Sequence, residues 1–209
     1  MLSWLTKNKT KEYKDRLLKS FPTELKSDVE SVIKILPLEK NDAKLCDGQV
    51  HKVENLIHPT ELTINVNREQ LTIPYRLYFN EPDIDSENNL TDRQKSIMNC
   101  IFLRHHNGYL REKRLKKLVH KDEKWIIPFT IQLLGEYVFE ILEVLDEHIN
   151  DKTINDYYSF IEENPKYWQQ TESRMISYWN EYYRRKFPKL KQYLGTALVK
   201  RIKKANAQQ

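Results

Sequence analysis

The chain has 209 residues, of which 39% are hydrophobic and 31% charged, and its formal net charge is +5. This length fits one large domain or two small ones, with apolar content sufficient for an ordinary core. A mean hydropathy of -0.75 and the lack of an apolar run of about eighteen residues exclude a membrane-spanning helix.

The glycines and cysteines narrow the class of protein further. The four glycines are scattered along the chain, which excludes a glycine-rich phosphate loop, since that needs two or three glycines within about eight residues. Cys46 and Cys100 lie far apart and are expected to be reduced thiols. The N-terminal residues lack the apolar core of a signal peptide, so we expect a cytoplasmic protein.

The first part of the chain mixes helical and strand patterns. Residues 10–20 and 23–36 have helical apolar spacing, and Pro37 ends the second helix. Residues 56–79 hold two β-rich runs around a polar turn, which predicts a hairpin with Pro74 on an edge strand or at a bulge. The acidic loop 80–89 is expected to separate two domains, 1–80 with helices and hairpin and 90–209 helical.

The rest of the chain reads as consecutive helices. Thr91 and Gln94 match a capping box that opens the first of them. A long helix is expected from about Pro128 to Ile149, with Tyr137 facing inward and Gly135 able to bend or interrupt it. The other expected helices cover about 109–119, 153–163, 166–186 and 189–205. The fold class expected is therefore mainly α with a small β-hairpin.

One stretch carries a family resemblance. NGYLREKRLKKLV, a polar turn followed by an aromatic residue, an arginine and spaced leucines, resembles the second helix of a HEAT-type repeat. Similar runs begin at Tyr109 and Tyr137, although Arg114 and Phe139 depart from the usual pattern. For residues 91–149 and the helices that follow, the resemblance implies a HEAT-like stacked helical array in the C-terminal two thirds. RHHNGYLRE with SYWNEYYRR also resembles a family of uncharacterised bacterial proteins, which implies no activity.

Charge alternates between adjacent segments. Residues 91–120 hold eight basic and two acidic residues, whereas residues 121–165 hold three basic and eleven acidic ones. In the latter, four glutamates at helical spacing predict one acidic stripe, which is a solvated face, a partner surface or a metal site. A di-iron motif fails because Leu145 stands three residues before His148. The stripe consists of Glu136, Glu140, Glu143 and Glu147.

The basic helix before the stripe has two interpretations. Arg111, Arg114 and Lys117 are expected on its exposed side, where they pair with the acidic stripe or bind phosphate groups. A helix-turn-helix over 92–119 is a third option. The turn histidines His105 and His106 suit a helix-end cap or a buried hydrogen bond, or else acid–base or metal chemistry.

Residues 174–186 are the segment that most suggests a binding surface, because they are rich in aromatic and basic residues. Tyrosine and tryptophan supply stacking surfaces and hot spots, while cations neutralise phosphates or acidic partners. Helical spacing places Trp179, Tyr182 and Tyr183 partly on one face with Ile176, so core packing is expected for about half of these residues. The candidate partner-binding residues here are Arg174, Tyr178, Trp179, Tyr182, Tyr183, Arg184 and Arg185.

No catalytic, cofactor or metal motif stands out, so we expect a non-enzymatic protein that binds another protein. A bacterial immunity protein that neutralises a cognate toxin is the specific role expected, by analogy of class. The alternative is a nucleic-acid-binding protein or a HEAT-like DNA-repair glycosylase, for which Asp156 and Glu181 are the nearest acids. No membrane association is expected.

Overall fold

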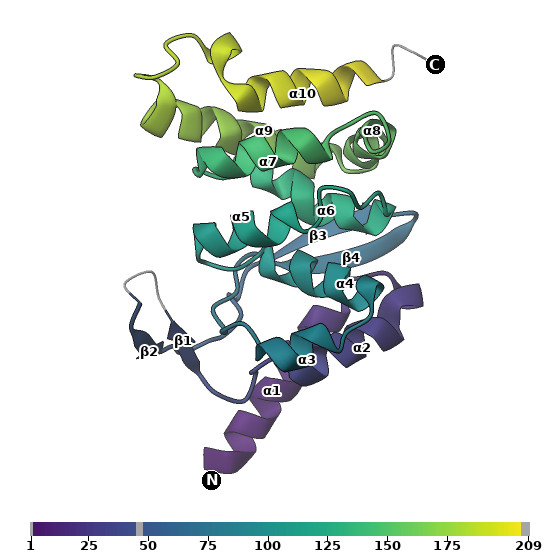
Figure 1. Cartoon of the computed structure of the whole chain (residues 1–209), viewed down its shortest axis with the longest axis vertical. Coiled ribbons are helices and arrows are strands. Elements are labelled where there is room, and N and C mark those ends of the chain that lie inside the picture. Colours follow the sequence, from purple (N-terminus) through teal and green to yellow (C-terminus); the bar gives the residue numbers. More distant parts are fainter. Residues whose placement is uncertain (1, 45–47, 206–209) are drawn as a thin grey trace. The chain divides into compact units, whose positions relative to one another are not determined.

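The structure is a computed structural model that describes residues 2–44 and 48–205, with side chains from residue 8 onward (Figure 1). Cys100 is buried, whereas Cys46 lies outside the described residues. Two compact units, Met1–Arg111 and Glu112–Gln209, divide the chain within helix α5 (Gly108–Lys116). The sequence instead placed a boundary in the loop 80–89, which contains the short helix α3 (Ile84–Asn88).

The first unit combines helices with two hairpins. Helix α2 packs against α1 and α4, and α1 also contacts β4. Apolar side chains of α2, including Val29, Val32 and Ile33, are buried at these contacts. Its elements are α1 (Leu2–Leu18), α2 (Lys26–Ile35), β1 (Asp42–Lys44), β2 (Val50–Lys52), β3 (Glu61–Val66), β4 (Glu69–Pro74), α3 and α4 (Asp92–Phe102).

The predicted hairpin is present as β3 and β4, which pair antiparallel from Glu61↔Pro74 to Val66↔Glu69. Asn67 and Arg68 form the two-residue turn, and both have positive φ, as a turn matching the strand twist requires. Pro74 ends the second strand, where its missing amide costs no ladder bond. The hairpin β1–β2 was not predicted, because strands of three residues leave little periodic signal.

The capping box at the start of α4 is confirmed. The Gln94 amide donates to the Thr91 hydroxyl oxygen at 3.3 Å, and the Thr91 amide donates to the Gln94 side-chain oxygen at 3.1 Å. Gln94 also donates to a carboxylate oxygen of Asp28 at 3.0 Å. The cap therefore links the start of α4 to α2.

The second unit is helical. Helix α10 packs against α7, α8 and α9, and α6 packs against α8 (Figure 1). Buried Leu198, Val199 and Ile202 form the inner face of α10. After α5, the helices are α6 (Ile127–Ile131), α7 (Phe139–His148), α8 (Ile154–Glu163), α9 (Pro165–Tyr178) and α10 (Leu194–Lys204).

The expected long helix 128–149 is wrong as a continuous element. Helix α6 ends in a 3-10 turn over Gln132–Gly135, Glu136–Val138 is extended, and α7 begins at Phe139. A Cβ atom on Gly135 would lie 3.2 Å from Cβ of Arg174 on α9, so the turn packs closely against that helix. The predicted interruption at Gly135 is thus confirmed.

Two other helix predictions are partly right. The helix expected over 166–186 is α-helical only to Tyr178 and continues as a π-helical turn, Trp179–Tyr183. The last helix begins at Leu194 instead of about 189. The mainly α chain with a small β-hairpin is confirmed. Among the described residues, no helix is both long and apolar enough to span a bilayer.

Candidate partner-binding surface

Three tyrosine rings meet on the surface of the second unit. Tyr137 comes from the extended segment before α7, Tyr178 ends α9, and Tyr182 lies in the π-helical turn. Their ring centroids are 5.9–6.0 Å apart in each pair. Tyr137 is 46% exposed and Tyr182 59% exposed, while Tyr178 is half-buried. We call these three residues the tyrosine cluster.

Beneath the cluster lies a second aromatic group. The Tyr183 hydroxyl donates to the carbonyl oxygen of Tyr137 and accepts from the Phe139 amide at 3.1 Å. Its ring stacks on buried Tyr193 with centroids 5.5 Å apart. Burial raises the pKa of Tyr183, so its hydroxyl group stays protonated and can donate the hydrogen bond to Tyr137. These contacts hold the extended segment and the π-helical turn together.

Tyr137 and Tyr182 therefore correct two expectations. Tyr137 was predicted to face inward, but the break after Gly135 turns it toward solvent. Tyr182 was expected partly on a core face with Ile176, yet both are exposed. The π-helical turn shifts side chains away from α-helical spacing, and such turns occur frequently at functional sites.

A run of cations follows the cluster directly. Arg184 donates to the side-chain oxygen of Asn180 at 3.0 Å and lies 5.9 Å from the Trp179 ring centroid. Trp179 is fixed in turn, because its indole N–H donates to the Phe187 carbonyl oxygen at 2.9 Å. We call the five exposed cations of residues 184–191 the basic turn. They are Arg184, Arg185, Lys186, Lys189 and Lys191.

Arg174 behaves differently from the other basic candidates. It is half-buried on α9, where its side chain packs beside Gly135. It therefore contributes to the packing of α9 against the turn 132–135. The structure brings together the tyrosines, Trp179 and the cations 184–185, and it places Arg174 below that surface.

The prediction of one acidic stripe with four glutamates is wrong. Glu136 lies in the extended segment and is only 3% exposed, so it shares no helix face with the other three. Glu140, Glu143 and Glu147 are exposed on α7. The four glutamates share one face only if a single helical period runs through Gly135, and the backbone changes direction at that glycine.

The basic helix α5 neutralises one of its own cations. Lys116 donates to a carboxylate oxygen of Glu112 at 2.6 Å. This hydrogen bond, followed by the charges of Glu112 and Glu147, raises the pKa of Lys116. Glu147 is the last of these causes, so the predicted pairing of the basic helix with the acidic stripe stays a prediction.

The prediction that Arg111 and Arg114 lie on an exposed basic face is wrong. Arg111 and Arg114 are each 1% exposed. Arg111 donates from one nitrogen to the carbonyl oxygens of His105 and His106, at 2.7 and 3.0 Å. Buried guanidinium groups that bind backbone carbonyls serve packing and are inaccessible to phosphate groups. A basic-patch count in sequence cannot separate buried from exposed arginines.

The turn histidines occupy structural positions. His105 Nε2 lies 3.1 Å from the Phe79 carbonyl oxygen, and its Nδ1 accepts from the Asn107 amide at 3.1 Å. Desolvation lowers the pKa of His105 to about 3, so the ring is neutral. His106 stacks on Tyr78 with centroids 5.6 Å apart, and burial lowers its pKa. Both ring nitrogens of His105 are therefore used internally.

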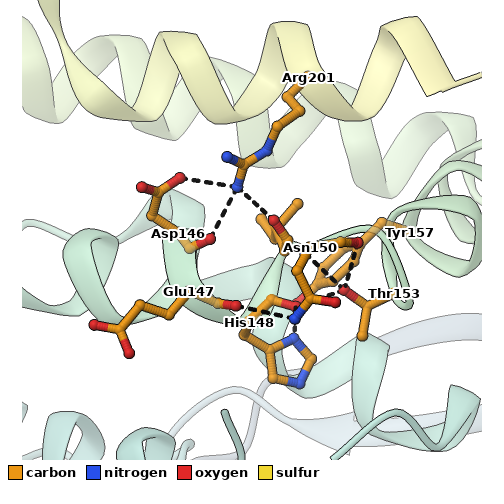
Figure 2. Close-up of polar contacts among 8 residues, drawn as sticks. Asp146, Glu147, His148, Asn150, Thr153, Tyr157 and Arg201 are labelled. Carbon is orange, nitrogen blue, oxygen red and sulfur yellow. Dashed lines mark hydrogen bonds and ion pairs between the residues drawn. The ribbon is translucent and has the colours of Figure 1, made fainter. Parts of the chain in front are cut away.

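A polar network closes the C-terminal end of α7. Figure 2 shows Arg201 reaching from α10 to this end, where it pairs with the Asp146 carboxylate at 2.8 Å and donates to the Ile149 carbonyl oxygen at 2.6 Å. Below it, Nδ1 of His148 lies 2.9 Å from the Tyr157 hydroxyl. A pocket of about 500 Å³ borders this end, lined by residues of α7, α8 and α10.

The acids considered for catalysis are not brought together. Asp156 pairs with Lys124 at 3.2 Å, and Glu181 is exposed in the π-helical turn. Within residues 2–44 and 48–205, no three His, Cys, Asp or Glu side chains are arranged to hold a metal ion.

No protein-family model matches the chain, and comparisons with curated proteins and with solved structures give no match.

Proposed function

We propose that the chain is a non-enzymatic protein that binds another protein through the tyrosine cluster and the basic turn. The observation that carries this proposal is the exposure of Tyr137 and Tyr182 above an ordered aromatic layer. Tyrosine and arginine are enriched among the residues that dominate binding energy at interfaces. Tyrosine also loses little conformational freedom on binding, and less still when neighbouring rings already hold it.

The specific role that we propose is neutralisation of a toxin protein, as an immunity protein does. It rests on analogy of class and on the helical character of the second unit. Residues 91–149 resemble HEAT repeats, and a HEAT-like array would suit this role because stacked helices offer long binding surfaces. The same surface also suits a protein partner other than a toxin, and the binding experiment identifies which partner it takes.

The test uses purified proteins encoded beside the gene and isothermal titration calorimetry. We expect one of them to bind, and Tyr182→Ala to weaken that binding at least about tenfold, as a central aromatic residue does. Tyr109→Ala is the matched control, because Tyr109 is 81% exposed and lies outside the cluster. Binding that is unchanged in Tyr182→Ala, or equally weakened in Tyr109→Ala, would contradict the proposal.

A second candidate function, nucleic-acid binding, is favoured by one observation. Residues 184–204 hold nine exposed cations and no acidic residue. Contacts with phosphates make affinity fall steeply with salt. If this function holds, fluorescence anisotropy with labelled single-stranded and duplex DNA should show binding at about 50 mM salt that weakens at least tenfold by about 200 mM. No binding at the lower salt concentration would exclude it.

A further inference from the structure

Some cations of the second unit pair with carboxylates, and among the described residues those of the basic turn do not. Four cations pair with carboxylates of the same unit, at 2.6–3.2 Å: Lys116 with Glu112, Lys124 with Asp156, Arg201 with Asp146 and Lys203 with Glu172. In the basic turn, by contrast, no side chain lies within ion-pair distance of a carboxylate belonging to the described residues. These cations are therefore available to the carboxylates of a partner.

Neutral groups hold two of these cations in place. The Asn180 amide oxygen and the Trp179 ring position Arg184. Lys186 lies 5.0 Å from the centroid of Phe139 and 5.4 Å from that of Phe187. A cation held by an amide and by ring faces keeps its full charge, unlike one held by a carboxylate. The basic turn is consequently ordered and still attracts anions.

Five positive charges within eight residues also repel one another. Because these charges are so close in sequence and the Debye length is about 8 Å at physiological salt, screening removes only part of this repulsion. An anionic partner relieves it, and the field of such a patch accelerates encounter with that partner. The charge complementarity therefore calls for a partner with clustered acidic groups.

The adjacent tyrosine cluster favours protein over nucleic acid. Ring centroids 5.9–6.0 Å apart indicate rings in direct contact, with no space for a base between them. Exposed Glu140 and Glu181 also border the cluster, and the charge of Glu140 contributes to the raised pKa of Tyr183. These carboxylates repel a phosphate backbone that follows the surface, whereas a protein can place neutral or basic side chains opposite them.

We infer that the partner presents an acidic protein segment, with Asp or Glu side chains on the basic turn and an apolar side chain against Tyr137 and Tyr182. This inference rests on the proposed function and specifies the chemistry of the partner. The partner's acidic groups speed its encounter with the basic turn and orient it there. Its apolar side chain adds binding free energy by burying apolar surface against the tyrosines.

The probe is a fluorescent peptide of about twelve residues, with two phenylalanines followed on one side by glutamates and on the other by neutral residues. Its binding is measured by anisotropy at about 50 and 200 mM salt. We expect binding by the wild-type chain. The combined variant Arg184→Gln, Arg185→Gln and Lys186→Gln should weaken it at least tenfold and reduce its salt dependence. Tyr182→Ala should weaken it while the salt dependence stays the same.

A charge-matched control separates this surface from net charge. Lys166, Lys200 and Lys204 are exposed in the same unit and outside the basic turn, so their combined change to Gln should leave peptide affinity within about twofold. Equal weakening in the control, no peptide binding, or preferred binding of a single-stranded oligonucleotide that the same variants abolish would each overturn the inference. The proposed function is judged separately, by the effect of Tyr182→Ala on a protein partner.

Discussion

The Tyr183 hydroxyl group donates a hydrogen bond to the carbonyl oxygen of Tyr137, 46 residues away in the chain. The Tyr183 hydroxyl oxygen also accepts a hydrogen bond from the Phe139 amide at 3.1 Å. One hydroxyl thus satisfies two backbone groups on either side of Val138, in a segment that has no strand partner of its own. This contact fixes where Tyr137 lies relative to Tyr182.

Tyr183→Phe removes that hydroxyl and keeps the ring. We expect the free energy of unfolding to fall by about 1 kcal/mol, because the part-buried Phe139 amide loses its acceptor and the exposed Tyr137 carbonyl loses its donor. Urea denaturation measures the change. Tyr182→Phe is the control, since its ring is 59% exposed, and it should change stability by less than about 0.5 kcal/mol. Equal effects of the two substitutions would show that the hydroxyl contact contributes nothing.

Buried His148 makes the stability of the second unit depend on pH. Desolvation lowers its pKa from 6.5 to about 4, despite an opposing backbone contact with Lys121. The unfolded chain therefore binds more protons between these values, and stability falls as pH drops from 6.5 toward 4. We expect a loss of about 2 kcal/mol from this group between pH 7.5 and pH 5.

Denaturation of His148→Gln at the two pH values isolates that contribution. The variant is expected to be less stable at pH 7.5, because Tyr157 loses its imidazole partner, but its loss on acidification should be smaller by about 2 kcal/mol. His120→Gln, at an exposed histidine of the same unit, should keep the wild-type pH profile. An unchanged profile in His148→Gln would refute the assignment.

Arg201 fastens α10 to the C-terminal end of α7. Arg201→Gln should lower the free energy of unfolding by about 1 kcal/mol, a modest value because both side chains of the ion pair are more than a third exposed. Loss of the hydrogen bonds to the Asp146 and Ile149 carbonyl oxygens accounts for part of it. Thermal denaturation beside Lys200→Gln, an exposed neighbour, provides the comparison. A larger shift in the Lys200 variant would contradict this role.

In the first unit, Thr91→Ala removes the N-cap of α4. The amide of Gln94 then loses its hydroxyl acceptor, and we expect a loss of about 1 kcal/mol by urea denaturation. Thr91→Ser keeps the hydroxyl group and should restore most of the stability. If Ser and Ala variants are equally destabilised, the methyl group of Thr91 matters and the cap does not.

Local patterns were sufficient for the elements with short-range signals. The Thr91–Gln94 cap and the hairpin around Asn67-Arg68 each depend on residues close in sequence, and each is present. The candidate site was predicted only in part. Its aromatic and basic composition was visible over residues 174–186, but Tyr137 was assigned to the core and Glu136 to the surface.

By itself, the sequence determined the mainly helical character, the β3–β4 hairpin and the concentration of cations near the C-terminus, because propensity, capping and composition are local properties. Tertiary structure decided which of those side chains face solvent. Close packing of Gly135 against α9 breaks the helical period, so Tyr137 turns outward and Glu136 inward. Burial likewise separates Arg111 and Arg114, which lie in the interior, from Arg184 and Arg185, which remain available to a partner.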